Sequence, residues 1–399
     1  MILVKIALHG GEPTSEKFIA YGRQSILEED IRAVTDALQS DYLTTGPLVA
    51  EFEKKLADYV GAKYAVAYSN GTAALHAACF AAGIGEGDEV ITTPLTFAAS
   101  ANCVLYMGGT PVFADINPET YNIDPADIRR KITDKTKAII PVHFTGQAAE
   151  LDEIRKIAEE YNLIVIEDAA HAIGTEYKGQ KIGSISEMTE FSFHPVKTIT
   201  TGEGGAITTN SKELYDKLKI FVTHGITRDK DLLVDKNQGG WYYEQLALGF
   251  NYRITDLQCA LGISQLNRVD QFVDDRRYIV DCYNEAFDEI DGVVIQKEIS
   301  ESNTARHLYI VQIELEKFKT GRKEIFEALR AENIGVNVHY VPVYYHPYYR
   351  SLGYEKGLCP IAENIYERII TLPLHPSMSE EDIMAVISAL KKVLDYYRK

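Results

Sequence analysis

The stretch EFSFHPVKTITTGEGGAITT, residues 190–209, decides the fold class of this chain. It predicts a short buried strand from Glu190 to Phe193, a loop that carries Lys197, a glycine turn, and a second strand from Ala206 to Thr209. Burial disfavours the ammonium form of a lysine, and the neutral amine is a nucleophile that forms Schiff bases with aldehydes. Because a lysine considered alone is more often a solvated loop residue, the interpretation of Lys197 depends on a second feature upstream.

That second feature is NLIVIEDAAHA, residues 162–172. Its apolar run from Leu163 to Ile166 predicts a central parallel strand, with Glu167 and Asp168 at the carboxyl end, beyond which ligands of open α/β sheets bind. An acid there and a separate buried lysine are the pair that pyridoxal 5′-phosphate (PLP) needs, because the lysine holds the aldehyde carbon and the acid keeps the pyridine nitrogen protonated. A helix cap is the alternative role for Asp168, and the two features together favour the cofactor.

The composition is typical of a globular protein of one or two domains, with 399 residues of which 46% are hydrophobic and 25% charged. The formal net charge of −17 argues against a nucleic-acid surface, which needs a basic footprint. The five cysteines show no CxxC spacing and predict the reduced thiols of a cytoplasmic protein. We expect no metal site, because the sequence contains no ligand cluster, and no membrane segment, because no apolar run is long enough.

Residues 64–222 alternate between strand and helix patterns, which predicts a mostly parallel seven-stranded sheet with helices on both faces. The expected strands are 64–68, 89–93, 111–115, 137–142, 163–167, 190–193 and 205–209. The expected helices of this region are 72–82, 97–107, 125–132, 150–161 and 211–222, and two more are expected over 28–40 and 48–59.

Three parts are expected along the chain: a loosely attached extension over residues 1–20, a large domain over 21–265, and a smaller α+β domain over 266–399. A long helix from about residue 255 towards residue 290, with a break near Asn267, is expected to connect the two domains. Residues 223–250 are expected to form a long loop, and loops of this length in compact domains are usually functional.

The segment YAVAYSNGTAALHAA, residues 64–78, predicts a strand, a turn and a helix. Gly71, Thr72 and Ala73 would place free backbone N–H groups at the start of that helix, which is a ready site for a phosphate. An ordinary helix cap by Asn70 or by Thr72 is equally compatible with the same letters.

Four motifs together resemble the DegT/DnrJ/EryC1/StrS family of sugar aminotransferases: SNGTAAL, EDAAHA, SFHPVKTITTGEGG and GFNYRITDLQCALG, the last over residues 249–262. The resemblance extends from about residue 20 to the end of the chain. It implies the α/β fold of PLP-dependent transferases of fold type I and a homodimer with shared active sites. For the cofactor it implies contacts by Gly71, Thr72, Ala73, Phe97, Asp168, His171, Ser192, Lys197 and Asn251, with Lys197 and Asp168 as the catalytic pair.

In the family, the turn at 71–73 and Ser192 hold the cofactor phosphate, and Phe97 stacks on its ring. Asn251 and Arg253 are implied to reach across the dimer interface. Taken alone, Phe97 fits a core position and Arg253 fits a surface ion pair.

Within the family, YGRQSI (21–26), SDYLTTGP (40–47), FVTHGITRD (221–229) and NVHYVPVYYHPYY (337–349) are similar to one branch. That branch transfers an amino group from L-glutamate to C4 of a UDP-linked 4-keto-6-deoxy-N-acetylhexosamine in the pseudaminic acid pathway. The similarity implies substrate contacts by Tyr21, Asp41, Tyr42, Leu43, Thr44, Gly71, Ser192, Asn251, Arg253, Val338, His339, Tyr340 and Val341. Two alternatives stay open: an aminotransferase for another nucleotide keto-sugar, and a non-catalytic protein that binds PLP or a sugar.

Overall fold

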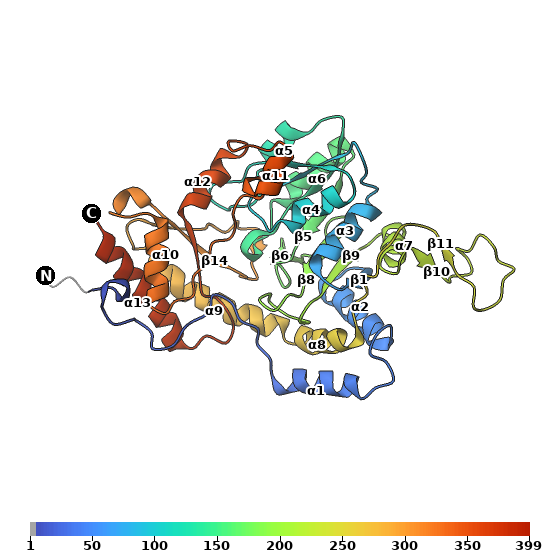
Figure 1. Ribbon diagram of the computed structural model, residues 1–399, viewed down its shortest axis with the longest axis horizontal. Helices are drawn as coiled ribbons and strands as arrows, with labels where there is room; N and C mark the ends of the chain where they lie inside the picture. Colours follow the sequence, from blue (N-terminus) through green and yellow to red (C-terminus); the bar gives the residue numbers. More distant parts are fainter. Residues whose placement is uncertain (1–4) are drawn as a thin grey trace.

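The computed structural model describes residues 5–399, and its centre is a seven-stranded sheet (Figure 1). The strands lie in the order β1-β9-β8-β5-β4-β2-β3. Their bounds are β1 Tyr64–Tyr68, β2 Glu89–Thr92, β3 Thr110–Phe113, β4 Thr136–Ile140, β5 Ile164–Asp168, β8 Met188–Ser192 and β9 Gly205–Thr209. Only β9 runs antiparallel to the other strands of this sheet. All seven expected strands form this sheet, and the predicted α/β fold class is confirmed.

Helices cover both faces of the sheet because each strand is apolar on both sides. On one face, α3, α4 and α7 pack on Val66, Ile166, Met188 and Ile207. On the other face, α2 and α8 pack at one end of the sheet, and α5 and α6 at the other end. The bounds are α1 Glu28–Leu38, α2 Pro47–Val60, α3 Gly71–Ala81, α4 Ala99–Tyr106, α5 Pro125–Lys131, α6 Leu151–Tyr161, α7 Lys212–Phe221 and α8 Asp256–Leu266.

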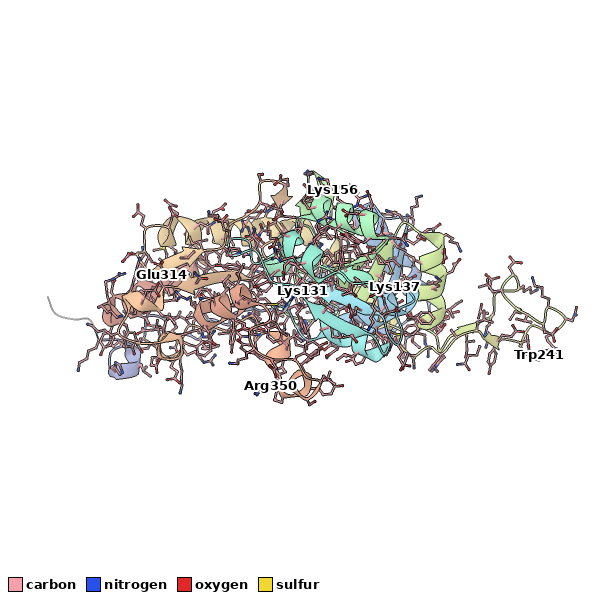
Figure 2. All side chains as sticks on the ribbon, turned by 90° about the horizontal axis from the view of Figure 1, so that it is seen from above. Lys131, Lys137, Lys156, Trp241, Glu314 and Arg350 are labelled. Atoms are coloured by element: carbon pink, nitrogen blue, oxygen red, sulfur yellow. The ribbon has the colours of Figure 1, made fainter. Side chains whose placement is uncertain are left out.

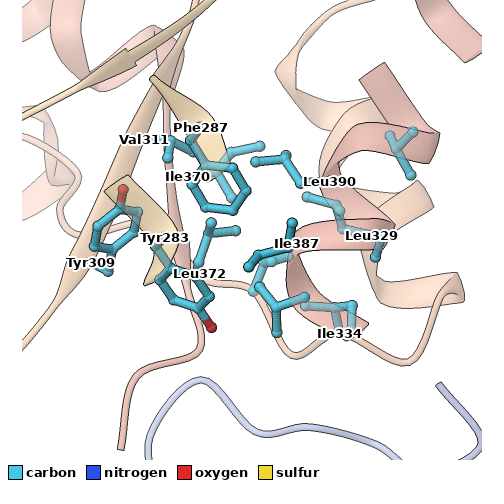
Figure 3. Close-up of a cluster of buried hydrophobic side chains, with 14 of the residues drawn as sticks. Tyr283, Phe287, Tyr309, Val311, Leu329, Ile334, Ile370, Leu372, Ile387 and Leu390 are labelled. Carbon is cyan, nitrogen blue, oxygen red and sulfur yellow. The ribbon is translucent and has the colours of Figure 1, made fainter. Parts of the chain in front are cut away.

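The C-terminal part is built on helix α9, Val269–Phe287, which follows α8 after the expected break at Asn267. An antiparallel sheet of β12 (Val293–Ile295), β14 (Tyr309–Ile313) and β15 (Ile369–Leu372) packs there on α10 (Arg322–Ala331) and α13 (Glu380–Tyr397). Figure 3 shows this core, with aromatic side chains of α9 and β14 facing aliphatic ones of α10 and α13. The remaining short elements are β6 Glu176–Tyr177, β7 Gln180–Lys181, β13 Ser302–Asn303, α11 Pro347–Ser351 and α12 Pro360–Arg368.

The segment before residue 21 is not loosely attached, as far as residues 5–20 describe it. Ile6 and Ile19 are buried in the C-terminal core. The Glu332 carboxylate accepts hydrogen bonds from the N–H groups of Ala7 and Thr14, each at 2.8 Å. The expectation of a loose segment was wrong because the partners of these residues lie more than 300 positions away in the sequence. The expected domain boundaries stay a prediction.

Residues 223–250 form a hairpin arm rather than an irregular loop. Strands β10 (Ile226–Thr227) and β11 (Glu244–Gln245) pair antiparallel and carry the arm away from the body (Figure 1). Figure 2 shows Trp241 in the distal loop of this arm. Two-residue strands are too short to give a periodic pattern, which explains why the sequence did not indicate them. No helix within residues 5–399 combines the length and the apolarity that crossing a bilayer requires.

Candidate active site

A cavity of about 850 Å³ opens at the carboxyl ends of the central parallel strands. This is the edge at which open α/β sheets bind their ligands. Its walls come from the loops after β1, β2, β4, β5 and β8 and from two segments of the C-terminal part. The lining residues are Tyr21, Asn70, Gly71, Thr72, Leu75, Thr96, Phe97, Ala99, Val142, Asp168, Ala170, His171, Glu190, Ser192, His194, Val196, Lys197, Glu203, His307, Leu308, His339 and Tyr340.

Lys197 reaches the cavity from the loop between β8 and β9. Its backbone N–H donates to the carbonyl of His194 at 2.9 Å, which tightens the loop around the lysine. Burial lowers the pKa of Lys197 to about 8, against the opposing effect of the Asp168 and Glu190 carboxyl groups. A substantial fraction of this amine is therefore neutral at mildly alkaline pH, as a nucleophilic lysine requires.

Asp168 ends β5, and its carboxylate is held by two donors. Ser100 Oγ donates to Oδ2 at 2.6 Å, and the N–H of Ala170 donates to Oδ1 at 3.2 Å. The hydroxyl of Ser100 also contacts that of Thr96, with the two Oγ atoms 2.8 Å apart. Ser100 was not predicted, because its only signal in the sequence is a polar residue near the start of α4.

The start of α3 has the free N–H groups that an anion site needs, except at Ala73. Asn70 caps the helix and accepts from the N–H of Ala73 at 2.8 Å. The N–H groups of Gly71 and Thr72 are left for a ligand, because the first N–H groups of a helix have no acceptor within it. Ser192 lies beside them, across from Gly71.

The space under this turn depends on Gly71. A Cβ atom at Gly71 would lie 2.4 Å from Glu190 Oε1 and 3.1 Å from Ser192 Cβ. Any side chain there would push the turn away from the sheet.

Histidine and tyrosine side chains form the wall opposite the sheet. The rings of His171 and His307 lie 4.4 Å apart, and His171 Nε2 is 3.2 Å from the hydroxyl of Tyr340. Burial, together with the charge of Lys197, lowers the pKa of His339 to about 4 and that of His171 well below its usual range. These two imidazoles are therefore neutral beside Lys197. His307 was not expected, and no local sequence signal marks it.

Phe97, also predicted, lies at the mouth of the cavity and is 64% exposed. Its ring is tilted towards Tyr340 at a centroid distance of 6.4 Å. Tyr21 lines the mouth as well and contacts the ring of His339 at 5.4 Å. The predicted residues Tyr21, Gly71, Ser192, His339 and Tyr340 thus meet in one cavity.

Other predicted residues do not line this cavity: Asp41, Tyr42, Leu43, Thr44, Ala73, Asn251, Arg253, Val338 and Val341. Val338 and Val341 flank the two lining residues between them. The segment from Asp41 to Thr44 is exposed, as is Asn251. Their roles stay a prediction.

Comparison with known proteins decides the family. A model of the DegT/DnrJ/EryC1/StrS aminotransferase family matches residues 24–391. The chain belongs to this family. Spore coat polysaccharide biosynthesis protein SpsC of Bacillus subtilis is 44% identical over 379 residues, 94% of this chain and 97% of the relative. UDP-4-amino-4,6-dideoxy-N-acetyl-beta-L-altrosamine transaminase of Campylobacter jejuni is 39% identical over 384 residues, 96% of this chain and 99% of the relative.

Solved structures agree with the DegT/DnrJ/EryC1/StrS assignment. Helicobacter pylori PseC, an aminotransferase involved in the biosynthesis of pseudoaminic acid, superposes with a TM-score of 0.89 at 31% identity, over 96% of this chain and 100% of PseC. The PLP form of the sugar aminotransferase Spr1654 from Streptococcus pneumoniae superposes with a TM-score of 0.88 at 32% identity, over 95% and 99% of the two chains. The protein is a PLP-dependent sugar aminotransferase.

The cavity of this aminotransferase fits PLP. Lys197 offers an amine that suits the aldehyde, and Asp168 offers a carboxylate that suits the ring nitrogen. The free N–H groups of Gly71 and Thr72 and the hydroxyl of Ser192 suit a phosphate. The missing side chain at Gly71 keeps that end of the cavity open.

Proposed function

We propose that this aminotransferase moves the amino group of L-glutamate to C4 of a UDP-linked 4-keto-6-deoxy-N-acetylhexosamine. The product would be UDP-4-amino-4,6-dideoxy-N-acetyl-β-L-altrosamine. The observation that carries transamination is the amine of Lys197, with its pKa lowered to about 8, in one cavity with Asp168 and the start of α3. The choice of sugar is supported by the relative of that name from Campylobacter jejuni and by the likeness to PseC.

The residues of the cavity have different roles in the proposed reaction. When bound, PLP supplies an electron sink for the negative charge at the reacting carbon. Lys197 Nζ takes the proton from the α-carbon of the amino donor and later returns a proton to C4 of the sugar. Asp168 would hold the ring nitrogen, and Ser192 with the Gly71 and Thr72 N–H groups would hold the phosphate. His339 and Tyr340, which line the same cavity, would contact the sugar.

The test follows both half-reactions in one spectrum. The absorption of PLP bound to the purified protein is recorded before and after L-glutamate, and again after the UDP-linked 4-keto sugar. A band that falls with glutamate and returns with the sugar supports the proposal. A band that glutamate leaves unchanged would reject the donor, and one that falls but does not return would reject the sugar.

A second sugar has a specific observation in its favour. Identity to SpsC, named for spore coat polysaccharide, is 44%, which is higher than the 39% to the altrosamine transaminase. A panel of nucleotide keto-sugars that differ in the base and in the C2 substituent separates the two substrates. Turnover (kcat/KM) that is greatest with another nucleotide keto-sugar of the panel would select the alternative.

We also propose that the active sites are shared in a homodimer. Asn251 is exposed and Arg253 does not line the cavity of its own chain, which suits residues that serve a neighbouring copy. Mixing inactive Lys197→Ala and inactive Asn251→Ala subunits tests this idea. Hybrid dimers would regain one intact site, so about a quarter of the wild-type activity should return on random mixing. No recovery would place Asn251 in its own chain's site.

A further inference from the structure

Glu190 is a buried acid of the cavity that the proposed mechanism does not use. Strands β5 and β8 pair in parallel, with Asp168 and Glu190 as direct partners, so both side chains lie on the same face of the sheet. Ser192, two positions along β8, shares that face with Glu190. Glu190 is fully enclosed, lines the cavity and lies beneath Gly71. A second carboxyl group is therefore a neighbour of the predicted ring-nitrogen partner.

The two carboxyl groups differ in their hydrogen bonds. Asp168 accepts from Ser100 Oγ and from the N–H of Ala170. Neither oxygen of Glu190 accepts a hydrogen bond from a donor of the described residues. Hydrogen bonds to the charged form favour ionisation, and two adjacent buried carboxyl groups do not both ionise. The pair therefore carries one proton, and that proton belongs on Glu190.

We propose that Glu190 is a positioning residue of the active site, which stays a neutral carboxylic acid beside Asp168 and keeps Asp168 as the anion that faces the cofactor. The proton of Glu190 gives Asp168 a further donor within reach. This inference depends on the PLP site and not on the identity of the sugar, so a different sugar substrate leaves it intact.

The surroundings of Glu190 agree with a neutral acid. Burial and the neighbouring Asp168 raise the pKa of Glu190 well above its usual range, and Lys197 opposes them only in part. These two are the ionisable groups that act on it. Strand β9 places uncharged Ile207 opposite Glu190, and α3 presents Gly71.

The histidine of α3 does not alter this balance. His76 Nδ1 lies 3.2 Å from the hydroxyl of Tyr252, and its ring packs against Phe221 and Phe250. It belongs to a separate aromatic cluster.

The experiment compares Glu190→Gln, which keeps a neutral donor, with Glu190→Ala, which removes it. We expect Glu190→Gln to keep kcat/KM close to that of the wild type, and Glu190→Ala to lose about ten-fold, as when a buried polar group loses its hydrogen-bond partner. Glu213→Gln, which makes the same exchange at an exposed position of α7, is the matched control.

A binding measurement separates positioning from simple packing. The Kd for PLP is measured by absorbance after equilibrium dialysis from about pH 6 to about pH 10, a range that includes the lowered pKa of Lys197. In the wild type, loss of the Glu190 proton at alkaline pH would place two anions side by side and weaken PLP binding. Glu190→Gln cannot lose that proton, so its alkaline weakening should be smaller, while Lys197 is common to both proteins.

Two results would overturn the proposal. If Glu190→Gln loses as much activity as Glu190→Ala, the negative charge of Glu190 is required. If the Kd of Glu190→Gln follows the same pH profile as the wild type, Glu190 holds no functional proton. The pH profile decides the question even where Glu190→Ala fails to fold, because it needs only the Gln variant.

Discussion

Strand β5 carries two adjacent buried acids that point to opposite faces of the sheet. Asp168 faces the cavity, where Ser100 and Ala170 leave its carboxylate accessible to a ligand. Glu167 faces the opposite side and is enclosed. Its Oε2 accepts from His143 Nε2 at 2.7 Å, and its Oε1 accepts from the N–H of Ser186 at 3.0 Å.

The difference shows that burial alone does not mark a functional acid. His143 Nδ1 accepts from the N–H of Ala149, so Nε2 carries the proton that is donated to Glu167. Both oxygens of each acid are matched by a protein donor, as buried polar groups require. What distinguishes Asp168 is that it lines the cavity beside Glu190, whose carboxyl oxygens have no donor, and this combination identifies the reactive side of the strand.

The largest effect on activity is expected for Lys197→Ala, which removes a basic group on the Asp168 side of β5. The variant should remain folded and lose turnover by about 10³-fold, because proton transfer at the reacting carbon has no replacement. The measurement is kcat with L-glutamate and a keto-sugar, with thermal melting as the check on folding. Normal transamination by this variant would remove Lys197 from the mechanism.

The next effect tests the comparison on β5 directly. Asp168→Asn should keep the fold but lose roughly 10²-fold in kcat, because a neutral amide no longer keeps the ring nitrogen protonated. Steady-state kinetics at saturating PLP measure it. An unchanged rate would mean that the two acids of β5 are equivalent, and the comparison would fail.

A pH effect is expected on the cavity side alone. With the pKa of Lys197 lowered to about 8, its neutral fraction, and with it the rate of PLP incorporation into apoprotein, should rise about ten-fold from pH 7 to pH 9 and then level off. Stopped-flow absorbance after addition of PLP checks this rate. An ordinary lysine would give a rate that still rises steeply at pH 9, which would show that burial does not tune Lys197.

A smaller effect is expected for Ser100→Ala. The variant removes one donor to Asp168 Oδ2 and should lower kcat roughly five-fold, with the fold intact. Ser100→Thr, which keeps a hydroxyl, is the matched control. A loss of stability without a loss of rate would reassign Ser100 to packing.

The smallest effect on activity is expected on the enclosed side. Glu167→Gln should leave kcat unchanged and lower the free energy of unfolding by about 1–3 kcal/mol, because the His143 and Ser186 donors lose a charged acceptor. Urea unfolding measures the change. A loss of rate in a fully stable variant would contradict the division of β5 into a reactive and a structural side.

The alternation of the sequence was enough to predict the seven-stranded sheet, because each strand is an apolar run of usual length between turn residues. Lys197 and Asp168 could be paired because strand ends converge at one edge of the sheet. Ser100 could not be found, since it meets Asp168 from 68 positions away. His307 and Glu190 were missed for a related reason: tertiary packing, not local pattern, places them in the cavity. The hairpin arm was not predicted from the sequence because its paired strands are only two residues long.

The hairpin arm gives the protein an optical label at a single known place. Trp241 is the only tryptophan of the chain, and it is 76% exposed in the distal loop of the arm (Figure 2). Tryptophan emission from the unmodified protein therefore originates in the arm and not in the cavity, which Trp241 does not line. The emission wavelength of Trp241 depends on its surroundings, so a partner that covers the arm would shift the emission to the blue. Events at Lys197 are followed separately, by the absorbance of the cofactor.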